Sequence, residues 1–499
     1  MVNNSTCSPL NALKNVIKKE DVSHKCVKEI TNILQELGDE FNGKTGVIQE
    51  MISSTYSIST GGVTMLNMSR WSGATGSYRS IQRMMSTHWD WLKINLICFG
   101  MWTCMTLHPQ RSEEELAILK KRYILTLDEV VEPKSRSKTY GIGRFFSSII
   151  QKPVNAIKTH VASIVDREKR KSFVLDHCQI LKSKESVKSQ KHTGVKAKAK
   201  LGRPKGSKNK KKAGRPKGSK NKMWQKEEGL IYSSMASLLS KVCPSFLKKF
   251  GFGLSYVVGD GSYGNKTACL IAREWGLDLI SKLNCTSALY WPFQGVYNRS
   301  GRPPIYGERI DLDKIAVNYR VSYQRQKDGT IEEIYHLNGV RSKRIPYVLN
   351  VVVIIRTKPN GQTARVILMS TCLNLTAEDI IEIYRLRFQI EFNFRNAKQY
   401  FGLADFKNTK PKQVNNAIGW SFFMENISTI LLEGFREEHQ NADLNIQDLK
   451  AWFRGHKYLD QILNYAEKTD EPILNQQQKQ RILKMGAINW NKGSKKNVA

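Results

Sequence analysis

The feature that most constrains the fold is a change of pattern at Tyr123, where helical periodicity gives way to short runs of branched residues. Residues 123–127 predict a first strand, and Ala156–Val165 and Ser172–Leu175 predict a hairpin about the turn Asp166–Lys169. The next predicted elements are a helix over Lys226–Phe250, a strand over Tyr256–Gly259, a helix over Lys266–Trp275 and a strand over Leu277–Leu283. Three antiparallel strands followed by alternating helices and parallel strands predict an α/β sheet with helices on its faces.

The segments on either side of this core have different patterns. Residues before 120 read as helical, residues 284–372 as short strands with turn signals, and the chain from Thr376 to about Lys484 as helical again. Within the first part, Gly62–Arg70 and Ser77–Met85 flank a short turn containing Gly and Ser, which fits a helix-turn-helix as well as an ordinary helical bundle. The second of these helices would present residue types suited to phosphates and base edges, namely Tyr78, Arg79, Gln82 and Arg83.

The net charge indicates a polyanionic partner. The chain has 79 Lys and Arg against 44 Asp and Glu, a formal charge of +35 over 499 residues, which favours nucleic acid or an anionic surface. A membrane span is not expected, because the longest apolar stretch, Ile94–Leu107, has 14 residues where about 20 are needed. Double-stranded DNA is therefore the preferred partner.

Much of the charge lies in one segment. Residues 181–222 hold 17 Lys and Arg and one acid, Glu185, and contain Gly-Arg-Pro-Lys-Gly-Ser-Lys-Asn-Lys twice, at 202–210 and 214–222. With almost no apolar residue, the segment is predicted to be a flexible tether. The Gly-Arg-Pro-Lys-Gly core resembles the AT-hook, which would make Arg203, Lys205, Arg215 and Lys217 minor-groove contacts. The alternative is a solvated basic linker that contacts phosphates without reading sequence.

Cysteine usage and the first residues indicate the compartment. The nine cysteines include no Cys-x-x-Cys pair, so we expect buried thiols and neither a disulfide frame nor a zinc cage. The first residues have no basic start followed by an apolar core, so no secretory signal is expected. A cytoplasmic location is predicted.

Two aspartates follow apolar strands. Asp128 comes after Leu-Thr-Leu and Asp260 after Val-Val-Gly. This position places a carboxylate at the carboxyl edge of a sheet, where α/β active sites lie. The ordinary alternative is that each is a turn residue, since Asp is frequent where strands end.

A third carboxylate lies in the helix predicted to open near Thr376. Tyr384, Arg387, Glu391 and Lys398 fall within about 60° of one another on a helical wheel that advances ~100° per residue. One face therefore carries a carboxylate suited to a metal ion and cations suited to phosphates.

The spacing Tyr-x2-Arg-x3-Glu-x6-Lys resembles the signature of bacterial DDE transposases of the insertion-sequence-four type, and the segments around Asp128 and Asp260 resemble those of the family's first two catalytic aspartates. The resemblance covers about residues 77–413 and implies an RNase H-like catalytic domain with a β-rich insertion. It further implies that Asp128, Asp260 and Glu391 bind two Mg²⁺ ions, which Mn²⁺ would replace, and that Tyr384, Arg387 and Lys398 hold phosphates.

The resemblance has further implications for partners and activity. Such an enzyme cleaves the ends of its DNA element and joins the freed 3′-OH to target DNA, with a homodimer expected in the synaptic complex on the bacterial nucleoid. Some relatives stack a flipped base on an aromatic residue of the insertion, for which Trp291 is the candidate; packing in the β-rich core is its alternative role.

One departure is Val130, where the family often has Thr. This departure leaves open the alternative that the protein is a decayed copy that binds DNA without cleaving it. A further alternative is a nuclease that cuts DNA without joining it.

The predicted architecture is thus an α/β, RNase H-like catalytic domain with a β-rich insertion, flanked by helical N- and C-terminal regions. Its predicted parts are a DNA-binding region (1–119), the first part of the catalytic domain (120–180), the basic linker (181–225), the second catalytic part (226–283), the insertion (284–372), the catalytic helix with Glu391 (373–405) and a helical C-terminal region (406–499).

Overall fold

A single sheet of twelve strands runs through the centre of the molecule in the computed structural model. The structure describes residues 25–59, 61–105, 111–135, 138–147, 150–182, 222–297 and 300–466. The strands are β1 (Tyr123–Pro133), β2 (Gly143–Ser147), β3 (Lys152–Asp166), β4 (Lys171–Ile180), β5 (Tyr256–Val258), β6 (Asp278–Leu283), β7 (Leu289–Pro292), β8 (Tyr306–Arg309), β9 (Arg320–Arg325), β10 (Ile331–Ser342), β11 (Ile345–Thr357) and β12 (Thr363–Ser370).

Five strands form the core around which the rest is arranged, in the order β4-β3-β1-β5-β6. β3 pairs antiparallel with both β4 and β1, whereas β1, β5 and β6 are parallel. The predicted hairpin, the two later strands and their relative directions are therefore confirmed. The prediction that the first strand ends at Leu127, just before Asp128, is wrong, because β3 holds β1 in register from the Tyr123–Asp166 pair to the Pro133–Ala156 pair.

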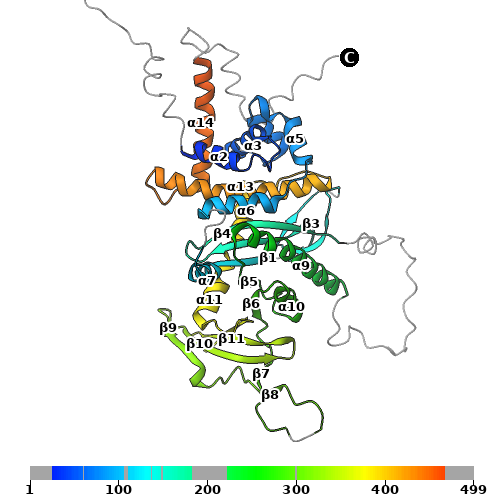
Figure 1. Cartoon of the computed structure of the whole chain (residues 1–499), viewed down its shortest axis with the longest axis vertical. Coiled ribbons are helices and arrows are strands. Elements are labelled where there is room, and N and C mark those ends of the chain that lie inside the picture. Colours follow the sequence, from blue (N-terminus) through cyan, green and yellow to red (C-terminus); the bar gives the residue numbers. More distant parts are fainter. Residues whose placement is uncertain are drawn as a thin grey trace, which may run out of the picture.

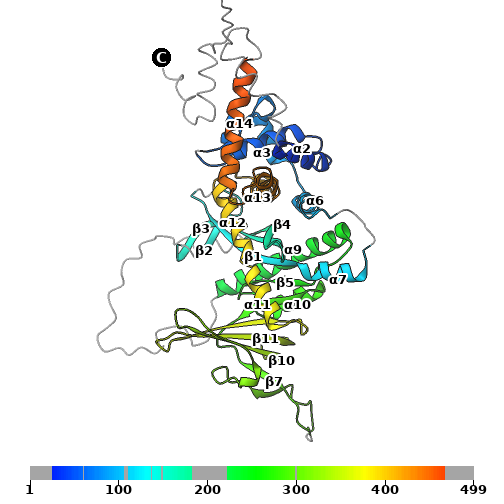
Figure 2. The same cartoon turned by 90° about the vertical axis from the view of Figure 1, so that its left-hand side faces the viewer.

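Helices cover both faces of this core and form a bundle at one end of the molecule (Figure 1). They are α2 (Lys25–Glu36), α3 (Thr45–Ser57), α4 (Met65–Trp71), α5 (Tyr78–Ser86), α6 (Trp91–Thr103), α7 (Glu113–Arg122), α9 (Lys222–Phe250), α10 (Lys266–Glu274), α11 (Ala377–Leu386), α12 (Gln389–Tyr400), α13 (Pro411–Glu438) and α14 (Ile446–Ala466). Figure 2 shows α12 and α11 one after the other alongside the central strands.

The alternation of β1 decides which helices it contacts. Tyr123, Leu125 and Leu127 pack in the apolar cluster that contains α9 and α10, whereas Ile124 packs with α11 and Val130 with α12 and α13. Successive strand residues point to opposite faces, so both faces of the core are apolar and both are covered.

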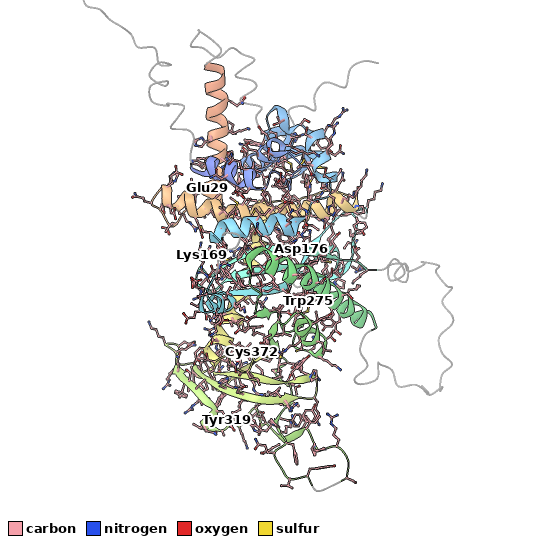
Figure 3. The ribbon with its side chains drawn as sticks, in the orientation of Figure 1. Glu29, Lys169, Asp176, Trp275, Tyr319 and Cys372 are labelled. Atoms are coloured by element: carbon pink, nitrogen blue, oxygen red, sulfur yellow. The ribbon has the colours of Figure 1, made fainter. Side chains whose placement is uncertain are left out.

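The strands after residue 284 extend the same sheet. β12 pairs antiparallel with β6, from Ile367–Leu283 to Ser370–Ile280, and β11, β10, β7 and β8 follow outward. The β-rich segment was predicted correctly as strands, and its continuity with the core sheet follows from this one pairing. In Figure 3, Tyr319, which precedes β9, marks this end of the molecule, far from Asp176 on β4.

The predicted pair of helices in the N-terminal bundle is present. Thr64 and Ser77 cap α4 and α5 by accepting hydrogen bonds from backbone amides three residues on, which fixes where each helix begins. The side chains of the helix α5 residues that were expected to face solvent, Tyr78, Arg79, Gln82 and Arg83, are exposed.

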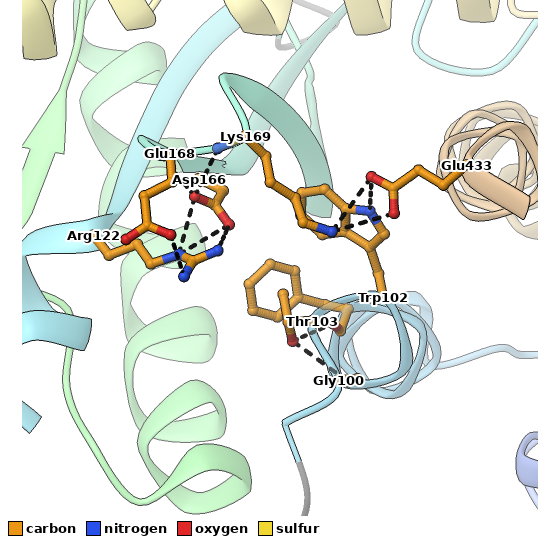
Figure 4. Close-up of polar contacts among 9 residues, drawn as sticks. Gly100, Trp102, Thr103, Arg122, Asp166, Glu168, Lys169 and Glu433 are labelled. Atoms are coloured by element: carbon orange, nitrogen blue, oxygen red, sulfur yellow. Dashed lines mark hydrogen bonds and ion pairs between the residues drawn. The ribbon is translucent and has the colours of Figure 1, made fainter. Parts of the chain in front are cut away.

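Polar contacts fasten the β3–β4 turn to three helices, α6, α7 and α13 (Figure 4). Arg122, at the end of α7, binds Asp166 through two guanidinium nitrogens, one of them at 2.6 Å. On the other side of the turn, Lys169 lies over the Trp102 ring and 3.2 Å from Glu433 of α13, which also accepts the Trp102 indole hydrogen bond. The sheet and the α6–α13 pair therefore form one body.

Several sequence features lie outside the described residues. Both basic repeats do so up to Asn221, as do the first 24 residues of the region predicted to be helical and the last residues of the chain. In the described part, one stretch of α9, Glu228–Phe250, is long and apolar enough to cross a membrane by length and composition. About a third of its most apolar part is buried, and those residues pack on the core sheet.

A close approach of two helices gives a test of the packing. A Cβ atom at Gly419 of α13 would lie 2.4 Å from the Trp91 ring of α6, whereas one at Gly455 of α14 would meet no atom within 4 Å. Gly419→Ala should lower the free energy of unfolding by about 1–3 kcal/mol through overpacking. Gly455→Ala should raise it by up to about 1 kcal/mol through helix propensity. Denaturant unfolding of both variants checks this, and equal stability of the two would contradict the α6–α13 packing.

Candidate active site

The two aspartates belong to neighbouring parallel strands, with Asp128 inside β1 and Asp260 in the turn that follows β5. β1 and β5 pair through Leu125–Val257 and Thr126–Val258, and Asp128 and Asp260 each come two residues later. Equal offsets put both residues near the same level of the sheet. Burial raises the pKa of Asp128 and of Tyr384, and the charge of Asp260, which lies beyond the end of β5, raises both further. The alternation of β1 puts the Asp128 side chain on the same face as Thr126. This is the face covered by α11 and α12.

Asp260 lies in a tight turn between β5 and α10. Its carboxylate accepts hydrogen bonds from the Ser262 amide at 2.8 Å and the Ser262 hydroxyl at 2.6 Å, and its carbonyl accepts one from Ser281 at 2.5 Å. A Cβ atom at Gly264 would come within 2.5 Å of the Lys282 carbonyl, so the turn packs closely on β6. The turn is thus held to the sheet from both sides of Asp260.

The helix that carries the third carboxylate begins as predicted but is interrupted. Thr376 caps α11 by accepting a hydrogen bond from the Asp379 amide. At Arg387 and Phe388 the backbone remains helical in its dihedral angles but changes to three-residue spacing, with Glu391 N donating to Phe388 O. The single continuous helix expected from the sequence is therefore two helices, and Glu391 lies in the first turn of the second.

Arg387 ties the new helix to the sheet. Its guanidinium donates to Asp128 Oδ2 at 2.9 Å and to Glu391 Oε1 at 3.1 Å, and it lies 5.9 Å from the centre of the Tyr384 ring. The Arg387 side chain is 14% exposed, compared with 18% for Asp128 and 42% for Glu391. The structure therefore brings Asp128, Arg387, Glu391 and Tyr384 together.

Lys398 lies on the same side of α12 but contacts a later part of β1. Its ammonium group is 2.5 Å from Glu132 and donates to the Val131 carbonyl at 3.2 Å. The predicted face is correct, because Arg387 and Lys398 both reach β1. Lys398 is paired with the buried Glu132 and does not touch Asp128, Asp260 or Glu391.

Burial makes the charge of Asp128 unfavourable. Desolvation raises its pKa to about 7; Arg387 opposes the shift, and the neighbouring carboxylates of Glu129 and Asp260 add to it. Burial also raises the pKa of Glu129, against the opposing effects of Lys158 and Tyr263. Carboxylates whose pKa is raised by burial and by neighbouring carboxylates are typical of functional sites.

Glu129 was not singled out by the sequence. It points to the opposite face from Asp128 and accepts a hydrogen bond from Tyr263, which in turn contacts His160. From the sequence, the alternation of β1 could have predicted that Glu129 faces α9. Its contact with Tyr263 could not be predicted, because it depends on long-range strand pairing.

The remaining predicted site residues lie elsewhere. Trp291 of β7 is partly buried and stacks on Tyr319 with ring centres 5.0 Å apart, in the β-rich part of the sheet. Arg203, Lys205, Arg215 and Lys217 lie outside the described residues. Val130 is buried with apolar residues of α12 and α13, so its side chain serves packing.

The carboxylates present oxygen donors to a divalent ion. Asp128 and Asp260 offer the oxygen donors that Mg²⁺ and Mn²⁺ prefer, and their mutual repulsion is what a cation would relieve. Glu391 is the third candidate, and in this arrangement it is bound to Arg387. Across the described ranges, no three His, Cys, Asp or Glu side chains are already gathered for one ion. The chemistry of the Asp128 and Asp260 carboxylates therefore suits a divalent ion.

The fold and site define an α/β protein with paired acidic residues at the level of neighbouring parallel strands. A family model described as DDE superfamily endonuclease matches residues 56–342, more than half of the chain. The chain belongs to this family. The match contains Asp128 and Asp260 and ends before Tyr384, so the insertion-sequence-four type inferred from the later signature stays a prediction.

The other comparisons are weaker. No curated protein sequence matches the chain. Among solved structures, the cryo-EM structure of a piggyBac transposase synaptic complex with hairpin DNA is similar, at 8% sequence identity and a TM-score of 0.33. The match covers 72% of this chain and 56% of that one, so the chain spans little more than half the length of that protein. Likeness at this level carries no argument about function.

The pKa of Asp128 predicts how stability depends on pH. It lies near 7 in the folded chain against 3.8 for the ordinary group, so the folded state binds the proton more tightly and loses stability as pH rises from about 4 to 7. Asp128→Asn removes this loss, and the variant should gain up to about 4 kcal/mol relative to the native chain between pH 4 and pH 8.

Denaturant unfolding across this pH range, without divalent ions, measures the difference. The exposed Asp443→Asn is the matched control and should follow the native profile. Parallel profiles for the native chain and Asp128→Asn would contradict the buried, repelled state of Asp128.

Proposed function

We propose that the protein is a DNA transposase that cleaves the ends of an insertion sequence and transfers the freed strands to target DNA. The observation that carries the proposal is the acidic pair Asp128 and Asp260, set level by the β1–β5 pairing and linked to Glu391 through Arg387. Membership of the DDE superfamily endonuclease family supports it. The strand order β4-β3-β1-β5-β6 supports an RNase H-like catalytic core.

The catalytic roles go to three carboxylates. Asp128, Asp260 and Glu391 would hold two Mg²⁺ ions, with Mn²⁺ able to substitute. When bound, the ions supply activation of the attacking oxygen and charge stabilisation for the leaving oxygen. Because one site of this kind serves water and a DNA 3′-OH equally, cleavage and joining need no second centre.

The cations beside the carboxylates would orient DNA. Arg387 occupies the space between Asp128 and Glu391, and we propose that it turns to a phosphate oxygen when DNA binds, leaving both carboxylates free. Tyr384 lies beside the Arg387 guanidinium and would contact the same phosphate. Lys398 would hold a phosphate further along the strand, where it now pairs with Glu132.

DNA binding away from the centre rests on charge and exposure. The +35 net charge, the basic repeats and the exposed α5 residues Arg79, Gln82 and Arg83 support contacts with element ends and target. A homodimer on DNA is part of the proposal, because two ends must be joined in one event. Trp291 remains the candidate for stacking a flipped base, although its ring already packs on Tyr319.

Glu391→Gln tests the proposed chemistry. The variant removes one negative charge and keeps the size of the side chain, so Mg²⁺-dependent cleavage and strand transfer should fall by at least about 100-fold, the lower end of what loss of a charge-stabilising group costs. Labelled DNA carrying the flanking element ends reports both products, and the binding affinity for DNA should stay near the native value.

Glu378→Gln is the matched control, since Glu378 is exposed on the neighbouring helix α11, and it should keep full activity. Native protein that cleaves but never joins would favour a nuclease. Native protein that binds DNA and does not cleave it with Mg²⁺ or Mn²⁺ would overturn the enzyme in favour of a DNA-binding regulator.

Removing the basic repeats tests their role. Deletion of residues 200–221, which stops short of α9, should weaken DNA binding and reduce the slope of log affinity against log salt by about 0.9 for each phosphate that the repeats neutralise. Cleavage at saturating DNA should persist. A salt series checks this, and an unchanged slope would show that the repeats do not bind the DNA.

A further inference from the structure

A chain of buried polar side chains lies on the far side of β1 from Asp128. The Tyr263 hydroxyl is 2.5 Å from Glu129 Oε1 and 2.9 Å from His160 Nε2, and His160 Nδ1 is 2.7 Å from the Ser234 hydroxyl of α9. Tyr263 and His160 are fully buried. None of these side chains contacts the face on which Asp128, Asp260 and Glu391 lie.

Two of these hydrogen-bonded residues lie close in sequence to the proposed metal-binding aspartates. Glu129 follows Asp128 directly on β1, and Tyr263 comes three residues after Asp260 in the turn that leaves β5. The Tyr263–Glu129 hydrogen bond therefore joins the two backbone segments that carry the proposed metal-binding aspartates. The β1–β5 ladder itself ends at Thr126 and Val258, two residues before either aspartate.

The turn is built around the Tyr263 ring. A Cβ atom at Gly259 would lie 2.4 Å from the ring, so the backbone just before Asp260 packs directly against it. Moving Tyr263 therefore moves the backbone on both sides of Asp260. Its hydroxyl is the only polar atom of the side chain, and Glu129 and His160 fix its place.

The free energy of folding alone does not explain why these polar side chains are buried together. Burying a phenol, a carboxylate and an imidazole costs free energy that their hydrogen bonds do little more than offset, and apolar side chains of similar volume would pack as well. Lys158, 3.7 Å from Glu129, offsets only part of the buried charge. A polar network held by close contacts does, however, fix distances within the core.

We propose that Tyr263 is a positioning residue whose hydroxyl, held by Glu129 and His160, sets the separation of Asp128 and Asp260 for binding a divalent cation. The inference rests on the proposed function, in which these two aspartates hold the metal. Partners of metal ligands that lie one step away from the ion act in this way, and their loss typically lowers metal affinity by about 10–100-fold.

Tyr263→Phe tests the role because it removes one oxygen and keeps the ring against Gly259. Calorimetric titration of the full chain with Mn²⁺ should show affinity lowered by at least about tenfold. DNA affinity should be unchanged. The Mn²⁺ concentration for half-maximal cleavage should rise by a similar factor, with the rate at saturating Mn²⁺ within about twofold of native, a split that general destabilisation does not produce.

The control is Tyr335→Phe, which deletes another tyrosine–glutamate hydrogen bond, to Glu333 in β10, and should leave Mn²⁺ affinity unchanged. A second variant, Glu129→Ala, removes the acceptor and leaves the phenol. It should weaken Mn²⁺ binding like Tyr263→Phe, and the double variant should be no weaker than the stronger single one, because both delete the same link.

The outcomes separate this inference from the proposed function. Native chain that binds no Mn²⁺ and cleaves no DNA would remove the proposed function and the inference with it. Native chain that does both, with Tyr263→Phe showing native Mn²⁺ affinity, would overturn the inference alone. Failure of both Tyr263→Phe and Glu129→Ala to fold would also overturn it, because the network would then serve stability and not the spacing of the aspartates.

Discussion

The site depends on one pairing, the parallel contact of β1 with β5. Two pairs of residues, Leu125–Val257 and Thr126–Val258, set the level of strands whose sequences lie more than 120 residues apart. A slip of one residue would turn one aspartate to the opposite face, away from α11 and α12. The antiparallel partner β3 fixes β1 along its whole length, and β6 fixes β5, so the register is held from both sides. Each helix that contributes to the site then packs on a sheet whose polar positions are already determined.

Around Asp128 and Asp260, nearby cations offset the charges of carboxylates that are costly to bury. Asp128 is close to Asp260 and Glu129, and Arg387 is the cation that offsets them on the face of α12. Arg387 lies at the break between α11 and α12. From there its guanidinium reaches both Asp128 and Glu391. On the other face, Tyr263 donates to Glu129 and contacts His160, which in turn contacts Ser234. Lys158 lies 3.7 Å from the Glu129 carboxylate. The two faces of β1 thus carry a charged site and a hydrogen-bonded support at the same point of the sheet.

Local patterns were sufficient for most of the elements, while the roles of the two aspartates stay predictions. The apolar runs before Asp128 and Asp260, the capping residue Thr376 and the helical spacing of Arg387 and Glu391 all lie within a few residues of what they determine. Long-range pairing decided the rest. β1 continues past Asp128 because β3 supplies partners to Pro133, and the β-rich segment joins the core sheet because β12 pairs with β6. Lys398 pairs with Glu132, and Glu129 meets Tyr263, through contacts that no local spacing encodes. The roles assigned to the basic repeats and to Trp291 stay predictions.

Asp128 and Asp260 are the residues that we propose bind a divalent ion together. The most direct measurement is the anomalous scattering of Mn²⁺ in crystals of the full chain soaked with the ion. The account predicts a peak between the carboxylates of Asp128 and Asp260, with the Arg387 guanidinium no longer in contact with Asp128. A saturated crystal with no peak at these residues, or with Mn²⁺ bound only elsewhere, would contradict it.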